Sequence, residues 1–393
     1  SIMALKNNTW KLNQWYDQAV AGNVSYTGVP GMYVWGNNPG GRLGLNNTSS
    51  PSSTLVQLPG TWVHIEVQSE NAGNGQQIGA INSDGELFTW GPNLYGALGT
   101  NQNIDPSASS PIQIPGTTWA SVAAGAKNMG AVKTDGTLWV WGDARDGAMG
   151  QNSGPVNLHR SSPIQIPGTT WKSGYLTSAA YDRQYLAIKT DGTLWSWGNN
   201  DGGRLGINAS SGHRSSPAQI PGTTWAFCAM GKNNSIAVKT DGTLWTWGDN
   251  DYGRLGINGA HGSQWSSPKQ IPGTTWKSTG KCLSASGDGM KALKTDGTMW
   301  AWGRNHFGQL GQNDRTDKSS PVQIPGTTWN IIDQGKNLNV AIKTDGTLWG
   351  FGGGVAAQVP GAYDNRSSPT QIQGSGWTGV SLSYQSYFGL TQF

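Results

Sequence analysis

The fold is decided by one stretch, Ala131-Val132-Lys133-Thr134-Asp135-Gly136-Thr137-Leu138-Trp139-Val140-Trp141. Apolar and β-branched residues on both sides of Asp135-Gly136 predict two short strands, and an Asp-Gly pair supplies the positive φ angles that a tight hairpin needs. The same hairpin recurs along the chain, at Asp84, Asp191, Asp241, Asp296 and Asp345. The chain is therefore built from repeats of one unit.

Two further landmarks recur in each copy. The first is a Trp-Gly pair at the end of the second strand, found at Trp35, Trp90, Trp141, Trp197, Trp247 and Trp302, with Phe351 in the seventh position. The second, in most copies Pro-Gly-Thr-Thr-Trp, gives Trp62, Trp119, Trp171, Trp225, Trp276, Trp329 and Trp377. Both series count seven. Four short strands in each of seven units predict an all-β, seven-bladed β-propeller.

The two ends of the repeat region complement each other. The strand at residues 31–35 has no Asp-Gly partner before it, and residues 377–393 have no Trp-Gly strand after them. We expect these segments to pair and close the ring, which removes free strand edges. The propeller then spans residues 31–393.

Residues 1–30 lie outside the repeat and form an N-terminal extension. Apolar residues between positions 9 and 20 have helical spacing, which predicts a short helix packed on the ring. Alternatively, Trp10, Trp15 and Tyr16 form a docking arm that inserts into another subunit, because aromatic anchors dominate many interfaces.

Composition excludes several classes of protein. Only 12 % of the residues are charged, and the formal net charge of +4 includes no basic run, so nucleic-acid binding is not expected. No apolar stretch is long enough for a membrane span, and the N-terminal residues lack the pattern of a signal peptide. Two cysteines, Cys228 and Cys282, cannot build a disulfide framework, which favours folding in a reducing cytoplasm.

The repeat resembles the regulator of chromosome condensation family. The segment Trp302-Gly303-Arg304-Asn305-His306-Phe307-Gly308-Gln309-Leu310-Gly311 is similar to the family's Trp-Gly strand and the Asn-x-x-Gly-Gln-Leu-Gly loop after it. The resemblance covers about residues 31–393 and implies a seven-bladed propeller. The histidine position of the family is occupied here by other residues, namely Gln77, Asn128, Gln184, Asn234, Gly289 and Leu338.

What the resemblance implies for function is limited by missing motifs. The family's founding member is an exchange factor for a small GTPase that acts while bound to chromatin, and no basic tail of that kind is present. Plant ultraviolet receptors of the same fold carry a Gly-Trp-Arg-His-Thr motif that is absent here. The nearly identical, weakly charged, tryptophan-rich copies are more similar to repeat proteins of bacteria and phages.

No catalytic, metal or cofactor motif is found. The chain lacks Gly-x-Ser-x-Gly and His-Glu-x-x-His. Three histidines, His159, His213 and His261, occupy the same loop in consecutive copies, but no second type of metal ligand recurs beside them. We therefore expect neither an enzyme, nor a metal site, nor a cofactor.

The loops that differ between copies are the candidate recognition surface. Core positions repeat closely, whereas the inserts at 100–108, 151–160, 207–214 and 257–265 diverge in length and composition. In repeat proteins such inserts often form one binding face, although neutral drift gives the same pattern. The candidate residues are Trp265, His159, Arg160, His213, Arg214 and Arg315.

These observations predict a non-catalytic binding or assembly module. The main prediction is a phage virion protein, either a decoration or a tail component, or a bacterial surface protein, located on the virion or the cell surface with other protein subunits as partners. One alternative is an intracellular scaffold or GTPase regulator. A second is a carbohydrate-binding, lectin-like propeller that uses exposed aromatic side chains such as Trp265.

Overall fold

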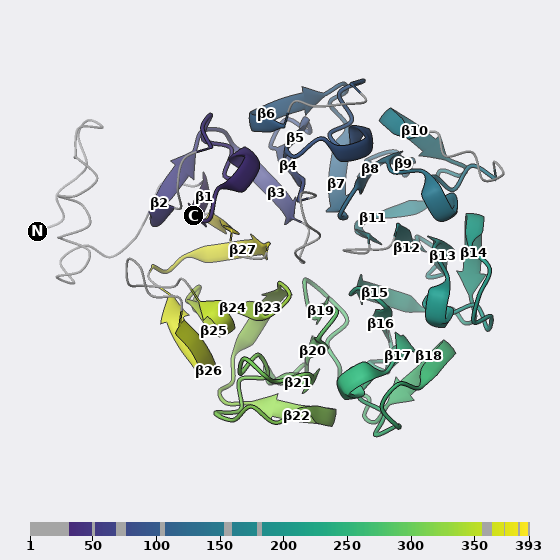
Figure 1. The fold of residues 1–393 in the computed structure, drawn as a ribbon, viewed down its shortest axis with the longest axis vertical. Coiled ribbons are helices and arrows are strands. Elements are labelled where there is room, and N and C mark those ends of the chain that lie inside the picture. Colours follow the sequence, from purple (N-terminus) through teal and green to yellow (C-terminus); the bar gives the residue numbers. More distant parts are fainter. Residues whose placement is uncertain are drawn as a thin grey trace, which may run out of the picture.

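The structure is a computed structural model. It describes residues 31–48, 52–67, 76–102, 107–152, 159–178, 183–355, 364–372, 374–383 and 386–391. These residues form seven four-stranded antiparallel sheets arranged around a central axis (Figure 1). The predicted seven-bladed propeller is confirmed. The proposed docking residues Trp10, Trp15 and Tyr16 lie outside the described residues.

Six blades are continuous in sequence, and their strands follow chain order from the axis outward. Blade 1 comprises β3 (Trp62–Val67), β4 (Ile78–Asn82), β5 (Leu87–Gly91) and β6 (Ala108–Ile114). Blade 2 comprises β7 (Trp119–Ala124), β8 (Asn128–Lys133), β9 (Leu138–Gly142) and β10 (Arg160–Ile166). Blade 3 comprises β11 (Trp171–Ser178), β12 (Gln184–Lys189), β13 (Leu194–Gly198) and β14 (Arg214–Ile220).

The next three blades repeat this order. Blade 4 comprises β15 (Trp225–Met230), β16 (Asn234–Lys239), β17 (Leu244–Asp249) and β18 (Gln264–Ile271). Blade 5 comprises β19 (Leu283–Ala285), β20 (Gly289–Leu293), β21 (Met299–Gly303) and β22 (Lys318–Ile324). Blade 6 comprises β23 (Trp329–Gln334), β24 (Leu338–Lys343), β25 (Leu348–Val355) and β26 (Asp364–Ile372).

The seventh blade joins the two ends of the propeller. It consists of β1 (Gly31–Gly36), β2 (Ser52–Leu58), β27 (Trp377–Leu382) and β28 (Ser386–Thr391), in the order β2-β1-β28-β27. β1 and β28 pair in an unbroken antiparallel register from Gly31↔Thr391 to Gly36↔Ser386. This composite blade confirms the predicted closure of the ring.

Short 3-10 turns follow the third strand of five blades. They are η1 (Pro39–Gly41), η2 (Leu94–Gly96), η3 (Arg145–Gly147), η4 (Asp201–Gly203) and η5 (Asp251–Gly253). Because strands alternate in direction, these turns and the connections between first and second strands lie on one face of the ring, here called the loop face. The Asp-Gly hairpins and Pro-Gly turns lie on the opposite face, here called the hairpin face.

Five of the Trp-Gly tryptophans connect their blade to the one before it. The indole Nε1 of Trp141 donates to the carbonyl oxygen of Ala97 in blade 1 at 2.9 Å, and four other blades repeat the contact at 2.7–3.0 Å. These indoles are fully buried, so each combines a large apolar contact with a satisfied hydrogen bond. Where Phe351 replaces tryptophan, Asn339 Nδ2 donates to the equivalent carbonyl, that of Gln309, at 3.0 Å.

A second repeated contact explains the Ser-Ser-Pro motif. Asn101, with φ of 63°, donates its backbone N–H to the carbonyl oxygen of Ser161 in the next blade at 2.6 Å. Five other asparagine–serine pairs repeat the bond between successive blades. Nearby, a Cβ on Gly96 would lie 2.6 Å from the Cα of Ser161. The loop glycine is therefore required by the close approach of two blades.

The remaining repeated tryptophans pack at the hairpin face. Lys133 Nζ lies 4.7 Å from the ring of Trp119 and 4.8 Å from that of Trp139, which are cation–π distances. Trp139 Nε1 donates to Thr137 Oγ1 at 3.0 Å. The same arrangement recurs at Lys189, Lys239, Lys294 and Lys343. The high tryptophan content therefore reflects blade packing.

The substitution Trp141→Phe tests the inter-blade hydrogen bond. It leaves the buried carbonyl of Ala97 without its donor, so we expect a loss of about 1–3 kcal/mol in the free energy of unfolding, measured by urea denaturation. Trp139→Phe is the control, since its Nε1 bonds to the hydroxyl of Thr137, and it should cost less.

Blade 6 suggests a second substitution that would give the Ala97 carbonyl a new donor in Trp141→Phe. Met129 pairs with Trp141 as Asn339 pairs with Phe351, so Met129→Asn supplies the amide that blade 6 uses. We expect Met129→Asn to be less destabilising in the Trp141→Phe background than alone. If Met129→Asn lowered the free energy of unfolding equally in wild type and in Trp141→Phe, the carbonyl of Ala97 would not need a donor.

Candidate functional site

The loop face of blades 1 and 2 carries an aromatic and cationic cluster around Tyr95. Tyr95 lies in η2 with φ of 59°, a left-handed conformation that is unusual for a bulky residue. Its ring lies 4.4 Å from the ring of His159, 4.9 Å from Arg145 Cζ and 5.4 Å from Lys127 Nζ. Three basic side chains of blade 2 therefore surround one tyrosine of blade 1.

The carboxylate of Asp143 contacts the basic side chains of this cluster. Its side chain is fully buried, and it accepts hydrogen bonds from Arg145 Nε and Nη2. Arg183 Nη1 lies 3.5 Å away and His159 Nδ1 lies 3.6 Å away. Burial by itself raises the pKa of Asp143, but the bonds and charge of Arg145 outweigh burial and keep the pKa below its usual value. Asp143 is therefore an ionised anchor for basic side chains.

The network continues into blade 3 through Asp146. Arg183 Nη2 lies 2.6 Å from Asp146 Oδ2, and Asn199 Nδ2 donates to the same oxygen at 3.1 Å. His213 Nε2 lies 3.6 Å from Asp146 Oδ1. Two predicted residues, His159 and His213, thus belong to one network of charged groups that spans three blades.

A second cluster of the same type lies on blades 4 and 5. Tyr252 in η5 has φ of 57°, and Arg304 Cζ lies 4.9 Å from its ring. The rings of His261 and His306 lie 5.3 and 6.0 Å from it. Arg304 also donates to His306 Nδ1 at 3.1 Å. The loop face therefore carries two tyrosine–arginine–histidine clusters, which we call the tyrosine clusters.

The other predicted site residues are not among the side chains that form these contacts. Arg160 and Arg214 begin β10 and β14 and are exposed, as is Arg315 in the connection from β21 to β22. Trp265 lies in β18, half-buried against the core, and Lys269 Nζ lies 4.3 Å from its ring. Much of the Trp265 indole is therefore covered.

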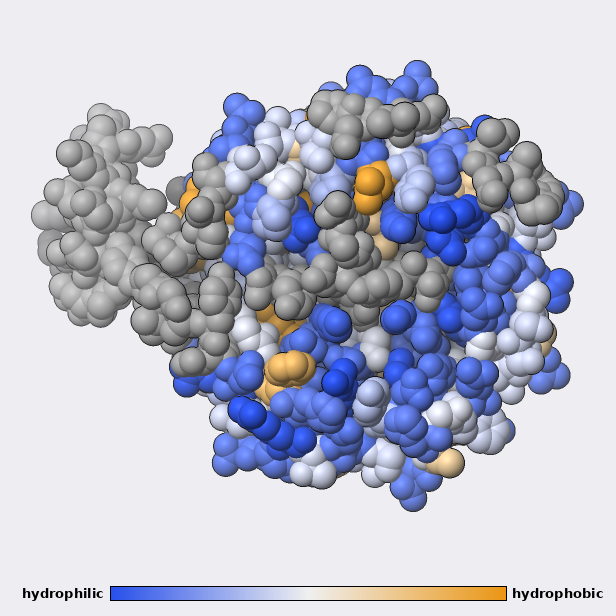
Figure 2. Space-filling model, viewed as in Figure 1, coloured by the Kyte–Doolittle hydropathy of each residue, from blue (hydrophilic) through white to orange (hydrophobic). Residues whose placement is uncertain are grey.

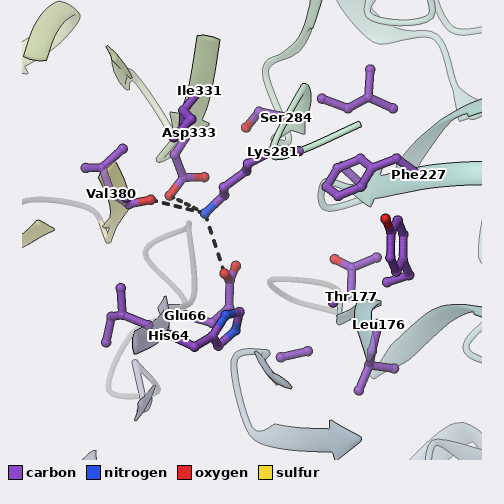
Figure 3. Close-up of a pocket in the computed structure, with 18 of the residues that line it drawn as sticks. His64, Glu66, Leu176, Thr177, Phe227, Lys281, Ser284, Ile331, Asp333 and Val380 are labelled. Atoms are coloured by element: carbon purple, nitrogen blue, oxygen red, sulfur yellow. Dashed lines mark hydrogen bonds and ion pairs between the residues drawn. The ribbon is translucent and has the colours of Figure 1, made fainter. Parts of the chain in front are cut away.

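The central cavity is the second candidate site. It has a volume of about 630 Å³ and is lined by the innermost strands of all seven blades. Lys281 extends into it between Glu66, Asp333 and the carbonyl oxygen of Val380 (Figure 3). Lys281 Nζ lies 3.5 Å from Glu66 Oε2, 3.2 Å from Asp333 Oδ2 and 3.3 Å from the Val380 oxygen. One ammonium group thus joins side chains and backbone of four blades.

An irregular inner strand places Lys281 there. In blade 2, Val122 follows Trp119 by three residues, whereas in blade 5 the equivalent Leu283 follows Trp276 by seven. The four extra residues form a bulge before β19 that includes Lys281. This departure from the repeat brings a lysine to two carboxylates.

The charges in the cavity affect one another. Burial, with repulsion from Glu66, outweighs the attraction of Lys281 and raises the pKa of Asp333 to about 6. Burial alone disfavours the Lys281 ammonium, but the two carboxylates more than compensate and raise its pKa. Burial lowers the pKa of His64, whose Nε2 lies 3.3 Å from the Val122 oxygen, to about 4. His64 is therefore neutral near pH 7.

Comparison with known proteins agrees with this architecture. The RCC1-like domain model matches residues 31–388. The chain belongs to the RCC1-like domain family. It is 27 % identical over 295 residues to the ultraviolet-B receptor UVR8 of Arabidopsis thaliana, a match that covers 75 % of this chain and 53 % of the receptor. It is 28 % identical over 180 residues to the human probable E3 ubiquitin-protein ligase HERC6, which covers 45 % of this chain and 17 % of the ligase.

Solved structures share the fold of this RCC1-like propeller. Human WBSCR16 has a TM-score of 0.78 at 16 % identity, with 93 % of this chain and 99 % of that chain covered. Yeast RCC1 (Prp20), in a structure bound to Kap60, has a TM-score of 0.75 at 18 % identity, with 100 % and 96 % covered. The chain spans about half of the receptor and a smaller part of the ligase that it matches.

These relatives correct two predictions. They are proteins of a plant, of humans and of yeast, so the predicted phage virion or bacterial surface function is wrong, as is the predicted virion or cell-surface location. The predicted bacterial or phage type of repeat has no support in them either. The physical reason is that tryptophan-rich, weakly charged copies follow from blade packing and do not indicate a particular assembly.

Sequence reasoning missed Tyr95 and Tyr252. A signal was present, because the equivalent loop positions in the composite blade and blade 3 are Gly40 and Gly202, both with positive φ. A tyrosine at a position that favours glycine carries backbone strain, and strained residues often lie at functional sites.

Membrane-spanning helices and metal-binding clusters are both absent from the described residues. In that part of the chain, no helix is long and apolar enough to cross a membrane. The same residues include no group of three or more His, Cys, Asp or Glu side chains arranged to hold a metal ion.

Asp333→Asn tests the cavity charges. The pKa of Asp333 is higher in the folded protein than in the unfolded chain, so the folded protein holds the proton more tightly. The protonated carboxyl therefore stabilises the fold fully below about pH 4, and this contribution is lost as the pH rises through about 6. The free energy of unfolding of Asp333→Asn relative to wild type should therefore increase from pH 4 to pH 7, by up to about 3 kcal/mol.

Asp345→Asn is the matched control. The hydroxyl and backbone N–H of Thr347 lower the pKa of the Asp345 carboxyl, so its contribution is lost as the pH falls. The variant-minus-wild-type difference in unfolding free energy should therefore change in the opposite direction, and it should do so below about pH 4, where the wild-type contribution is lost. If the unfolding free energy of Asp333→Asn relative to wild type did not vary with pH, the pKa of Asp333 would not be raised in the folded protein.

Proposed function

We propose that this RCC1-like propeller is a regulatory module that binds a protein partner of the small-GTPase class through its loop face, without covalent chemistry of its own. The observation that carries the proposal is the presence of the two tyrosine clusters on that face. Tyrosine and arginine are enriched among residues that dominate binding energy at protein interfaces. The backbone strain at Tyr95 and Tyr252 further supports a role beyond folding.

The contrast between the two faces supports this choice. The hairpin face repeats one arrangement of Asp, Thr, Lys and Trp in five blades. The loop face instead carries charged groups that differ from blade to blade. Specific recognition of one partner needs such a unique pattern. The face seen in Figure 2 is largely hydrophilic, which suits polar recognition.

The class of partner is suggested by the family resemblance. The founding member of the family is an exchange factor for a small GTPase, and the solved structure of yeast Prp20p comes with a description of its binding properties to Gsp1p and histones. Because Prp20p is only 18 % identical to this chain, its similarity shows a shared fold. The proposed class of partner therefore has to be tested directly by binding to small GTPases.

Binding without catalysis is consistent with the described nucleophiles. Burial raises the pKa of both thiols, Cys228 and Cys282, to about 12, so neither is a ready thiolate. Carbohydrate binding through Trp265 stays a prediction, and Lys269 over its ring leaves less aromatic surface for a sugar.

The test combines binding with nucleotide release. Small GTPases loaded with fluorescent GDP are mixed with the full chain, and we expect binding and faster release for at least one of them. In Tyr95→Gly and Tyr252→Gly, affinity should fall about tenfold or more if each ring is an energetic centre of the interface.

The glycine substitutions separate binding from folding. Because glycine accepts positive φ, relief of backbone strain offsets the lost ring contacts, so both variants should fold and unfold at temperatures close to that of wild type. Thr223→Arg, on the exposed hairpin face, is the control and should leave affinity unchanged. No binding across the GTPase panel, or equal losses in Thr223→Arg, would reject the proposal.

A further inference from the structure

Arg42 is a buried cation with no counter-charge among the described residues. It follows η1 in the composite blade, and only 8 % of its surface is exposed. No described carboxylate forms an ion pair with it, and its buried Nε has no hydrogen-bond partner. Burial lowers its pKa to about 10, which leaves the guanidinium charged at neutral pH. Burying a charge without a partner is costly, so an anion that binds this guanidinium would stabilise the fold.

Other blades show what normally accompanies this arginine. The stretch Asn38-Pro39-Gly40-Gly41-Arg42 corresponds to Asn250-Asp251-Tyr252-Gly253-Arg254 in blade 4. There, Arg254 Nη2 lies 3.3 Å from Asp251 Oδ2, and Arg254 Nε donates to the Asp251 carbonyl oxygen at 2.9 Å. Blade 3 also has an aspartate, Asp201, at this position. The composite blade keeps the arginine but has Pro39 in place of the aspartate.

The geometry of blade 4 shows that a carboxylate reaches this guanidinium from the solvent side. The side chain of Arg254 is 6 % exposed, whereas that of its partner Asp251 is 38 % exposed. In the composite blade Pro39 is exposed and its side chain has no acceptor atom. The turn of the composite blade therefore supplies no carboxylate to Arg42 at the position where Asp251 supplies one to Arg254.

We propose that Arg42 forms a binding site for one carboxylate group, which an acidic side chain of a protein partner or a free carboxylate anion supplies. Arginine suits this role because its planar guanidinium forms charge-assisted hydrogen bonds with a carboxylate. The site lies on the loop face at the junction of the composite blade and blade 1, where the carbonyl of Arg42 accepts from Trp90 Nε1 at 2.7 Å. It does not depend on the class of partner proposed above.

The first experiment measures thermal unfolding of the full chain in sodium acetate against sodium chloride at constant ionic strength. Acetate should raise the unfolding temperature of wild type by about 1–3 °C, since a ligand that binds only the folded state stabilises it. Arg42→Met should show no such difference. Pro39→Asp restores the carboxylate of blade 4 within the chain, so it should be more stable than wild type in chloride and should not respond to acetate.

A reciprocal variant provides the matched control. Asp251→Ala removes the partner of Arg254 and creates a second site of the same type, so its response to acetate should exceed that of wild type. A wild-type unfolding temperature that acetate does not change would overturn the proposal. So would an equal response of wild type, Arg42→Met and Pro39→Asp, which would show a general salt effect.

The source of the carboxylate is distinguished by a second probe. The Nε–H resonance of Arg42, assigned by its loss in Arg42→Met, is followed by NMR during titration with acetate and with a blocked Gly-Glu-Gly peptide. A stronger response to the peptide identifies an acidic side chain as the source, and equal responses identify a free anion. If neither probe shifts the resonance, the site does not bind carboxylates.

Discussion

The ring depends on the hydrogen bond from a buried indole to a carbonyl of the preceding blade. Each blade alone would expose two apolar faces, and a flat hydrophobic contact would allow neighbouring blades to slide. The bond from Trp141 to Ala97 and its four equivalents fix the register of five of these contacts, while the indoles fill the space between the sheets. The compensation at Phe351, where Asn339 supplies the donor, shows that the carbonyl must be satisfied by some group. The six asparagine–serine bonds add a second fixed point to the successive junctions from the composite blade to blade 6.

The rigid ring explains how the loop face can be specific. Blades held in register place side chains of different blades at defined distances, so Tyr95 of blade 1 meets Arg145 and His159 of blade 2. Asp143 and Asp146 then connect these groups to Arg183 of blade 3. Variation in a few loop residues can thus create a distinct surface without any change in the core.

The sequence was sufficient for the fold because its signals are local and repeated. Alternating residues beside Asp135-Gly136 define a hairpin, and the incomplete units at the two ends define closure. The candidate sites were only partly predictable. His159 and His213 were expected in equivalent loops, but their shared network depends on Arg183, whose loop position carries no motif. Lys281 reaches Glu66 and Asp333 only because a bulge shifts the inner strand of blade 5, and such a shift depends on pairing that composition does not encode. The predicted phage or bacterial function is wrong because it rested on a likeness between nearly identical, weakly charged, tryptophan-rich copies and bacterial or phage repeat proteins, and such copies do not indicate a particular assembly.

The composite blade also constrains the order of events during synthesis on the ribosome. β1 and β2 emerge before the other strands of the propeller, but their sheet lacks its inner half until β27 and β28 have been made. Throughout translation of the six intervening blades, the inner edge of β1 therefore has unsatisfied backbone groups, which can pair with other chains. While the six intervening blades are made, the propeller is an open arc, and its protection from aggregation depends on the later synthesis of the hairpin formed by β27 and β28.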